Sequence, residues 1–391
     1  MKRAVILSGA RTPVGSFNGM FKRVPAVQLG GAAIKNAITK AGIAPGDVDE
    51  VIMGMVLQGG VGQAPARQAA KLAGVPNEKS AWTINKVCSS GLKAVMEAAG
   101  SVLLGENGIV AAGGMENMTL APYLLPNGRN GYRYGHGQVV DMMMHDGLWD
   151  PYSNQHMGSC AELCAAEHNI TREEQDVFAL ESYRRANAAI KDGLFKEEIV
   201  PIVLPGKKGE TILDTDEEPG RGKPDKVPTL RPAFKKDGTV TAANASSIND
   251  GGAALIVADP DLAAERDLKP IAEIVGWATH SQAPEWFTTA PAGAINKLLD
   301  KIGWKLEEVD VFEINEAFAV VSLYNNRALG LDDAKVNVRG GAVALGHPIG
   351  ASGARILVTL LHILKQGGGK RGIASLCNGG GEATALAVEM L

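Results

Sequence analysis

An internal duplication limits the folds open to this chain more than any other feature of its 391 residues. Residues 33–42 match residues 294–303, and Val48-Asp49 matches Val309-Asp310 at the same spacing. Each copy has the pattern of an amphipathic helix that stops at a glycine, a short connector and an apolar strand, expected at 51–54 and at 311–314. Because helix and strand alternate in both copies, the sequence predicts two α/β halves, each built on a mainly parallel sheet.

The correspondence continues into the next elements. The turn around Cys88 and its helix parallel the turn around His347 and its helix, and the apolar strand at 109–113 parallels the one at 373–377. Between them lies a different segment, rich in Gly, Pro, Met and charge. We therefore expect three parts: an N-terminal half (1–119 with 245–268), an inserted loop domain (120–244) and a C-terminal half (269–391).

Composition excludes several classes of protein. The formal net charge of −4 lacks the basicity typical of nucleic-acid binding, and no apolar stretch reaches the ~20 residues that span a membrane. The four cysteines show neither a CxxC pair nor metal-ligand spacing, and four in so long a chain do not make a disulfide framework. The sequence predicts a cytoplasmic protein with no nucleic-acid partner, no membrane partner and no metal site.

Cys88 lies where a strand-like run gives way to a helical pattern with Leu92, Val95 and Met96 on one face. Backbone N–H groups at a helix start are unpaired and the helix dipole is positive there. We therefore expect the pKa of the Cys88 thiol to be lowered and the thiol to act as a nucleophile. The alternative is a small buried thiol, which is the commoner role of an isolated cysteine.

Three other polar residues follow or end predicted strands: Asn315, His347 and Cys377. In open α/β sheets, functional residues gather at the carboxyl ends of strands. His347 has glycines on both sides, and Cys377 precedes Asn378 and three glycines whose N–H groups can point at an anion. Taken alone, each of these residues could be structural. Approximate two-fold symmetry of the duplication would bring the Cys88 and His347 turns to one crevice.

Two cysteines and one histidine suit carbon–carbon bond chemistry on thioesters. One thiolate takes an acyl group, and a second thiol moves a proton to or from a carbon next to a carbonyl. Enolate formation requires strong oxyanion stabilisation, which fixed N–H donors supply. A hydrolase would not require the second thiol.

At these residues the sequence closely resembles the thiolase family, and within it the short-chain acetyl-CoA acetyltransferases. The matching blocks occur in order at residues 8–13, 85–91, 113–118, 244–246, 249–251, 315–319, 346–353 and 377–381. The resemblance implies a duplicated thiolase-type α/β fold, with two mixed, mainly parallel sheets sandwiched by helices and an inserted loop domain.

The resemblance also implies a role for each site residue. Cys88 would carry the acyl group, His347 would activate it, and Cys377 would exchange a proton with the methyl carbon of acetyl-CoA. One oxyanion hole would use His347 and a water held by Asn315; the other would use the N–H groups of Cys88 and Gly379. The implied reaction is ping-pong: reversible thiolysis of acetoacetyl-CoA or another short-chain 3-ketoacyl-CoA, or condensation of two acetyl-CoA. Coenzyme A is a substrate, and no cofactor is expected.

The family's CoA site lies largely on the inserted domain. Matching positions here are Leu148, His156, Met157, Arg221, Phe234, Ser246, Phe287, Ala317 and Phe318. The His156-Met157 pair resembles the short-chain enzymes, whereas Phe287 stands where many bacterial members have Met, which would reshape the acyl pocket. Residues 217–226, around Arg221, match poorly. Residues 124–144 correspond to the tetramerisation region, so a homotetramer, a dimer of dimers, is expected.

Other readings stay open. A degradative 3-ketoacyl-CoA thiolase of fatty-acid β-oxidation, with a broader chain-length range, would share all these motifs. Decarboxylating ketoacyl synthases of the same fold lack a cysteine at the position of Cys377. A non-catalytic acyl-CoA-binding relative would be expected to have lost Cys88 or His347.

Overall fold

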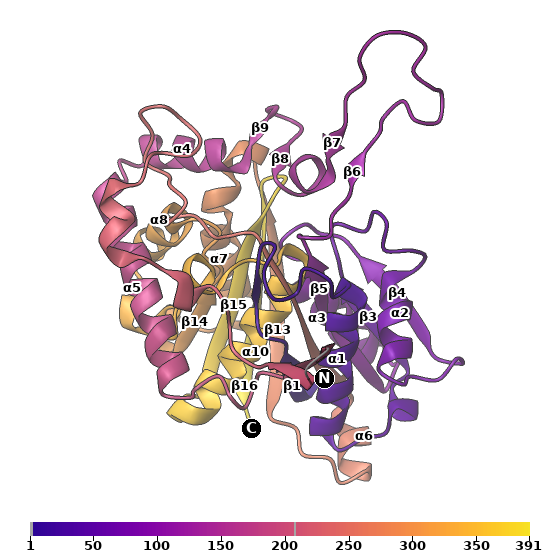
Figure 1. Cartoon of the computed structure of the whole chain (residues 1–391). Helices are drawn as coiled ribbons and strands as arrows, with labels where there is room; N and C mark the ends of the chain where they lie inside the picture. Colours follow the sequence, from indigo (N-terminus) through magenta and orange to yellow (C-terminus); the bar gives the residue numbers. More distant parts are fainter. Residues whose placement is uncertain (1–2, 207–208) are drawn as a thin grey trace.

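In the computed structural model, which describes residues 3–206 and 209–391, strands from both copies of the duplication join one ten-stranded sheet (Figure 1). The strand order is β14-β15-β16-β13-β1-β12-β5-β3-β4, with β2 paired to β12. The strands are β1 (Val5–Arg11), β2 (Gly15–Ser16), β3 (Glu50–Gly54), β4 (Ser80–Ile84), β5 (Ile109–Asn117), β12 (Asn249–Ala258), β13 (Ala272–Ser281), β14 (Val311–Ile314), β15 (Arg371–Asn378) and β16 (Glu382–Met390).

The two halves of this sheet repeat one pattern, so the predicted duplicated α/β fold is confirmed. β3 is parallel to β5 as β14 is parallel to β15, and β12 and β16 then run antiparallel to both of their neighbours. β4 lies parallel to β3, and its counterpart beside β14 is a single parallel bridge between Phe312 and Val336.

Two details differ from the prediction. Each half is mixed rather than mainly parallel, because β16 follows β15 through a three-residue turn and can only return antiparallel. The halves also do not form separate sheets: β1 and β13 pair through Val5–Glu273 and Ile6–Ala272. This short pairing gives hydrogen-bond partners to backbone N–H and C=O groups that would be unpaired at the edges of two separate sheets.

The helices are also duplicated. α1 and α7 match, and each ends at a glycine in the left-handed conformation, Gly42 (φ 72°) and Gly303 (φ 71°), as the predicted stops require. α3 matches α10. The helices are α1 (Ala26–Ala41), α2 (Pro65–Leu72), α3 (Ser90–Leu104), α4 (Met157–Glu167), α5 (Arg172–Lys191), α6 (Pro260–Glu265), α7 (Ala290–Ile302), α8 (Ala319–Leu329), α9 (Ala342–Leu345) and α10 (Ile349–Gly367).

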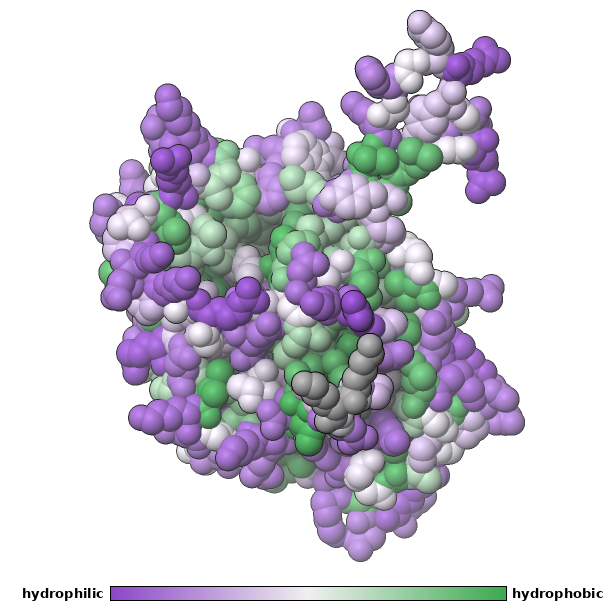
Figure 2. Space-filling model, in the orientation of Figure 1, coloured by the Kyte–Doolittle hydropathy of each residue, from purple (hydrophilic) through white to green (hydrophobic). Residues whose placement is uncertain are grey.

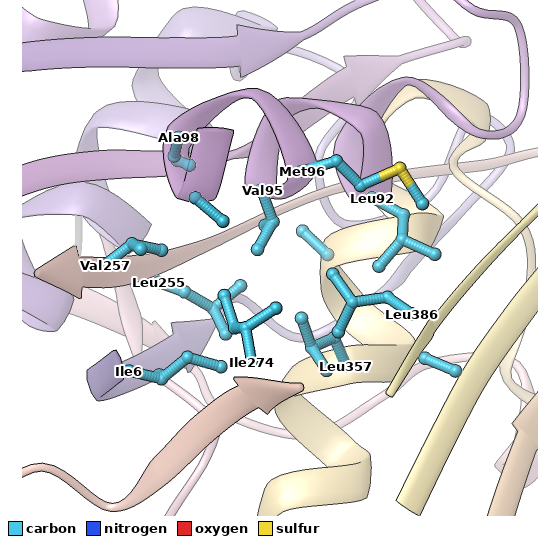
Figure 3. Close-up of a cluster of buried hydrophobic side chains, with 14 of the residues drawn as sticks. Ile6, Leu92, Val95, Met96, Ala98, Leu255, Val257, Ile274, Leu357 and Leu386 are labelled. Atoms are coloured by element: carbon cyan, nitrogen blue, oxygen red, sulfur yellow. The ribbon is translucent and has the colours of Figure 1, made fainter. Parts of the chain in front are cut away.

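α3 and α10 pack against each other in the middle of the molecule. Figure 3 shows side chains of α3 meeting Leu357 of α10 and residues from strands of both halves, such as Leu255 and Leu386. The segment Val87–Leu104 is apolar and long enough to cross a membrane by length and composition alone. Its apolar face lies in this core, so α3 is a core helix.

The residues between the halves carry α4, α5 and three short ribbons. The ribbons are β6–β7 (Tyr123–Leu124, Val140–Asp141), β8–β9 (Trp149–Asp150, Gln155–His156) and β10–β11 (Ile202–Gly206, Gly209–Leu213). A capping box of Thr171 and Glu174 begins α5. The chain beyond β6 and β7 stands out from the body as a long extension (Figures 1 and 2). The division at residues 119, 244 and 268 stays a prediction.

Candidate active site

A tight turn between β4 and α3 presents Cys88. Val87 has a φ of 48°, a left-handed conformation that is strained for a β-branched residue. Two hydrogen bonds hold it: the Val87 N–H donates to Asn85 Oδ1 at 2.9 Å, and the Ser90 hydroxyl donates to the Val87 carbonyl at 2.6 Å. The turn therefore presents Cys88 to a cavity.

The thiol of Cys88 is partly exposed to a cavity that Gly379 also lines, and the backbone N–H groups of Gly379 and of Cys88 itself act to lower its pKa. Burial nevertheless raises its pKa to about 12, and the charge of Glu116 adds to the effect. The expectation of a lowered pKa is therefore wrong for the free protein, because desolvation outweighs the helix start and both N–H groups. Cys88 needs a base at hand to react.

His347 lines the same cavity as Cys88. Its Nδ1 lies 2.6 Å from the Ser352 hydroxyl, which itself donates to the Pro348 carbonyl at 3.0 Å. Because the serine has one proton to donate, Nδ1–H donates to Ser352 and Nε2 carries the lone pair. Nε2 has no hydrogen-bond partner among the described residues. Burial, and then repulsion from Arg355, lowers the pKa of His347 to about 3, so the imidazole is neutral.

Buried polar groups hold the backbone of the His347 turn. The His347 N–H donates to Asn249 Oδ1 at 2.9 Å. The Glu116 carboxylate accepts from the N–H groups of Val56, Leu57 and Gly350 at 3.0, 3.1 and 2.8 Å. Burial raises the pKa of Glu116 to about 7. Glu116 thus ties the loop after β3 to the first turn of α10.

Cys377 and Asn315 end or follow neighbouring strands, as predicted. Cys377, near the end of β15, is fully buried. Burial raises its pKa well above the ordinary value, and Cys88 is close enough to raise it further. Asn315 follows β14, and its N–H donates to the Ser375 carbonyl at 2.9 Å. Neither polar atom of its buried side chain has a hydrogen-bond partner among the described residues.

A single cavity of about 370 Å³ brings most of the predicted site together. Its lining includes these predicted residues: Cys88, Leu148, His156, Met157, Phe234, Ser246, Phe287, Ala317, Phe318, His347 and Gly379. Cys377 belongs to the buried apolar cluster that also contains Met157, Phe287 and Phe318. The structure therefore brings most of the predicted residues to one site, Asn315 and Arg221 being outside the cavity lining, and the roles of all of them stay predictions.

Arg221 alone among the predicted contacts lies outside this cavity. It borders a neighbouring hollow of about 310 Å³, which shares Ala242 with the main cavity, and its guanidinium pairs with Glu217 at 3.4 Å. Residues 217–226 match the thiolase family poorly, and this poor match agrees with the position of Arg221 outside the main cavity.

Sequence reasoning missed several site residues. Met118, Thr241, Ser247, Ile248 and Ile349 also line the cavity. Glu116, Asn249 and Ser352 lie inside matching blocks, but nothing in their spacing shows that they hold the His347 turn. A buried carboxylate or amide within an apolar strand is the signal that could have found the first two.

Aromatic side chains form one wall. His156 stacks on Phe234 with ring centroids 4.7 Å apart, and Phe318 meets Phe234 and Phe287 edge-on at 6.2 and 6.3 Å. His156 Nδ1 accepts the Gly158 N–H at 2.9 Å and so caps α4. Burial lowers the pKa of His156, which keeps this wall uncharged. Among residues 3–206 and 209–391, no group of three or more His, Cys, Asp or Glu side chains is placed to hold a metal ion.

Two family descriptions match the chain almost from end to end. "Thiolase, N-terminal domain" matches residues 4–261, and "Thiolase, C-terminal domain" matches residues 268–390. The chain belongs to the thiolase family. As a member of this family, the protein is an acyltransferase, which confirms the prediction from the sequence.

Curated relatives of this thiolase match over the whole length. Acetyl-CoA acetyltransferase 2 of Arabidopsis thaliana is 52% identical over 389 residues, covering 99% of this chain and 96% of the relative. The acetyl-CoA acetyltransferase of Cupriavidus necator is 51% identical over 391 residues, covering 100% of both.

Solved structures agree. The acetyl-CoA acetyltransferase of Bacillus anthracis superposes with a TM-score of 0.97 at 44% identity, covering 100% of this chain and 99% of that one. A thiolase of Ascaris suum in complex with coenzyme A superposes with a TM-score of 0.95 at 45% identity, covering 100% of both.

Proposed function

We propose that this thiolase is an acetyl-CoA C-acetyltransferase, which cleaves acetoacetyl-CoA with CoA or condenses two acetyl-CoA. One observation carries the proposal: Cys88, His347 and Gly379 line one cavity, and Cys377 lies buried close to Cys88. The relatives named acetyl-CoA acetyltransferase, and the thiolase solved with coenzyme A, support the same substrates.

The first half-reaction uses the neutral His347. Its Nε2 takes the Cys88 proton, and the thiolate attacks the 3-keto carbon of acetoacetyl-CoA. The N–H groups of Cys88 and Gly379, two residues that line the same cavity, would stabilise the oxyanion. The C2–C3 bond then breaks, leaving an acetyl group on Cys88 and an acetyl-CoA enolate. The Cys377 thiol protonates that carbon, and acetyl-CoA leaves.

In the second half-reaction the acetyl group moves from Cys88 to the sulfur of CoA. The CoA thiol gives its proton to the Cys377 thiolate and attacks the acetyl carbonyl on Cys88. The C–S bond to Cys88 breaks, and the Cys88 thiolate takes its proton back from His347. The products are acetyl-CoA and the free thiol. We assign Asn315, whose amide has no hydrogen-bond partner among the described residues, to hold a water that forms an oxyanion hole with His347.

The cavity suits a thioester with a short acyl group. Its volume of about 370 Å³ lies at the small end of ligand sites, and its lining is mostly apolar. Phe287 and Phe318 are only 3% and 8% exposed and stand edge-on to each other, so they close the acyl end. The hollow beside Arg221 adjoins the cavity at Ala242 and would take the nucleotide end of CoA.

We also propose that this thiolase forms a homotetramer, lies in the cytoplasm and serves fatty-acid metabolism. The β6–β7 extension supports assembly, because Tyr123, Leu125, Tyr134 and Val139 are 67%, 53%, 101% and 65% exposed along it. Four free cysteines suit a reducing compartment. Replacing residues 125–139 by a short Gly/Ser link should halve the mass measured by light scattering. An unchanged mass would contradict the tetramer.

Turnover assays test the activity directly. Wild-type protein should consume acetoacetyl-CoA and CoA, with kcat/KM falling steeply for longer 3-ketoacyl-CoAs; a flat chain-length profile would instead favour the broad-range β-oxidation thiolase. Cys377→Ala should still accept an acetyl group on Cys88 but lose condensation. Full condensation activity in Cys377→Ala would exclude the two-thiol mechanism.

A further inference from the structure

Two side-chain bridges join the turn that carries Cys88 to the turn that carries Gly379. Lys86 forms an ion pair with Glu382, and the Ser89 hydroxyl donates to Asn378 Oδ1 at 2.7 Å. Lys86 and Ser89 stand on either side of Cys88 in the chain, and Asn378 and Glu382 stand on either side of Gly379. We call these four residues the turn clamp.

The clamp is built into a larger network. The Thr384 hydroxyl donates to Ser89 at 3.0 Å, and the Ser281 hydroxyl donates to Glu382 at 2.9 Å. Ser89 and Asn378 are buried, whereas the side chains of Lys86 and Glu382 are 20% and 29% exposed. Partial burial raises the pKa of Glu382, but the hydrogen bonds from Lys86 and Ser281 outweigh burial and hold this pKa below its ordinary value. Glu382 is therefore charged at neutral pH.

The Gly379 turn needs such support. Gly380 and Gly381 have φ values of 90° and 78°, a region that glycine adopts without strain, so no side chain of their own fixes the turn. Yet an oxyanion hole that uses the N–H groups of Gly379 and Cys88 needs both at one point of the cavity that these residues line, and the two groups come from opposite halves of the molecule. An oxyanion hole works only when its donors are fixed before the charge develops.

We infer that the turn clamp aligns the Gly379 and Cys88 N–H groups as a single oxyanion hole, with Lys86 and Glu382 as positioning residues that touch no reacting atom. The inference rests on the proposed function and deepens it. Since partly exposed ion pairs contribute little to stability, breaking Lys86–Glu382 should affect turnover far more than folding.

A double-mutant cycle separates this role from a merely structural one. Lys86→Met and Glu382→Gln should each lower kcat about tenfold, a fraction of the roughly 100-fold that loss of an entire oxyanion-hole donor costs. KM for acetoacetyl-CoA should stay within about twofold, and the double variant should be no worse than either single variant. The charge-swapped pair Lys86→Glu with Glu382→Lys should recover part of kcat.

The matched control is the Lys93–Glu97 ion pair, which lies on α3 just beyond the Cys88 turn. Lys93→Met with Glu97→Gln should leave kcat within about twofold. Additive losses in the cycle, a change in KM alone, or equal losses in the control pair would overturn the inference.

A readout without CoA keeps this test independent of the proposed function. Since the Gly379 N–H lowers the pKa of Cys88, a loosened turn should slow alkylation of Cys88 by iodoacetamide at fixed pH by about threefold. Mass spectrometry of the Cys88 peptide measures the rate. A wild-type protein with no thiolase activity would sink the proposed function, whereas an unchanged alkylation rate in Glu382→Gln would sink the clamp.

Discussion

Single residues decide which groups of this site can act. His347 can serve as a base only if its proton sits on Nδ1, because Nε2 is the nitrogen without a protein partner among the described residues. Ser352 fixes that tautomer by accepting from Nδ1 while donating to Pro348. Cys88, whose pKa is raised to about 12, depends on this base more than a thiol at an open helix start would.

Ser352→Ala should lower kcat by roughly tenfold, because the tautomer with its proton on Nδ1 loses a hydrogen bond of about 1.4 kcal/mol that favours it over the other tautomer. Ser352→Thr keeps the hydroxyl and should retain most activity. Steady-state thiolysis by the two variants provides the measurement. Wild-type kcat in Ser352→Ala would show that the tautomer is set elsewhere.

For single residues, the sequence predicts which side chains can react better than it predicts their burial, pKa and hydrogen-bond partners. The cysteines, His347 and Asn315 could be found from their places after strands and among glycines. The pKa of Cys88 could not, because its direction depends on burial by residues far away in the chain. Ser352 and Glu116 were missed for the same reason: their partners are fixed by tertiary contacts.

At the scale of elements, the contact between α3 and α10 sets the distance between the Cys88 and His347 turns. Each helix offers a glycine at the crossing. A methyl group on Gly91 would lie 2.8 Å from the Ala354 nitrogen, and one on Gly353 would lie 2.4 Å from the Leu92 nitrogen. Backbone thus meets backbone here, which only glycine allows.

Gly353→Ala should destabilise the protein by about 1–3 kcal/mol, as overpacked cores do, and should reduce activity by separating the two turns. Gly100→Ala is the matched control, since Gly100 lies in α3 with open space around it and should stabilise by about 0.4–1 kcal/mol. Urea unfolding measures both variants. Equal stability of the two would show that the helices can move apart freely.

The order of helices and strands was predictable from the duplication, whereas the strand directions were not. Periodicity and glycine stops located α1, α7 and their following strands. They contained no information on β12 and β16, whose direction is set by a return after the inserted residues in one half and by a tight turn in the other.

At the scale of the whole molecule, folding buries several titratable groups with opposite effects on stability. Burial lowers the pKa of His347 to about 3, whereas it raises those of Glu116 and Asp250 to about 7 and 6. Because the pKa of His347 is lower in the folded protein, its contribution to the free energy of unfolding is complete above pH 6.5, the ordinary histidine pKa. This contribution is lost as the pH falls toward 3. The two carboxyl groups act in the opposite direction.

Comparison with His347→Asn isolates the histidine. Between pH 7 and pH 5 the wild type should lose about 2 kcal/mol more of its free energy of unfolding than the variant does, at 1.36 kcal/mol per unit below 6.5. Urea unfolding at both pH values measures the difference. Equal acid sensitivity of the two proteins would mean that His347 is charged in the folded state.

The central claim is that Cys88 carries the acetyl group between two half-reactions. Brief exposure to acetyl-CoA, acid quenching and mass spectrometry of the peptides test it most directly. The account predicts one acetyl group on Cys88, retained in Cys377→Ala, reduced in His347→Asn and absent in Cys88→Ala. Acetylation confined to Cys160 or Cys164, or an unmodified Cys88 in a protein that turns over, would contradict it.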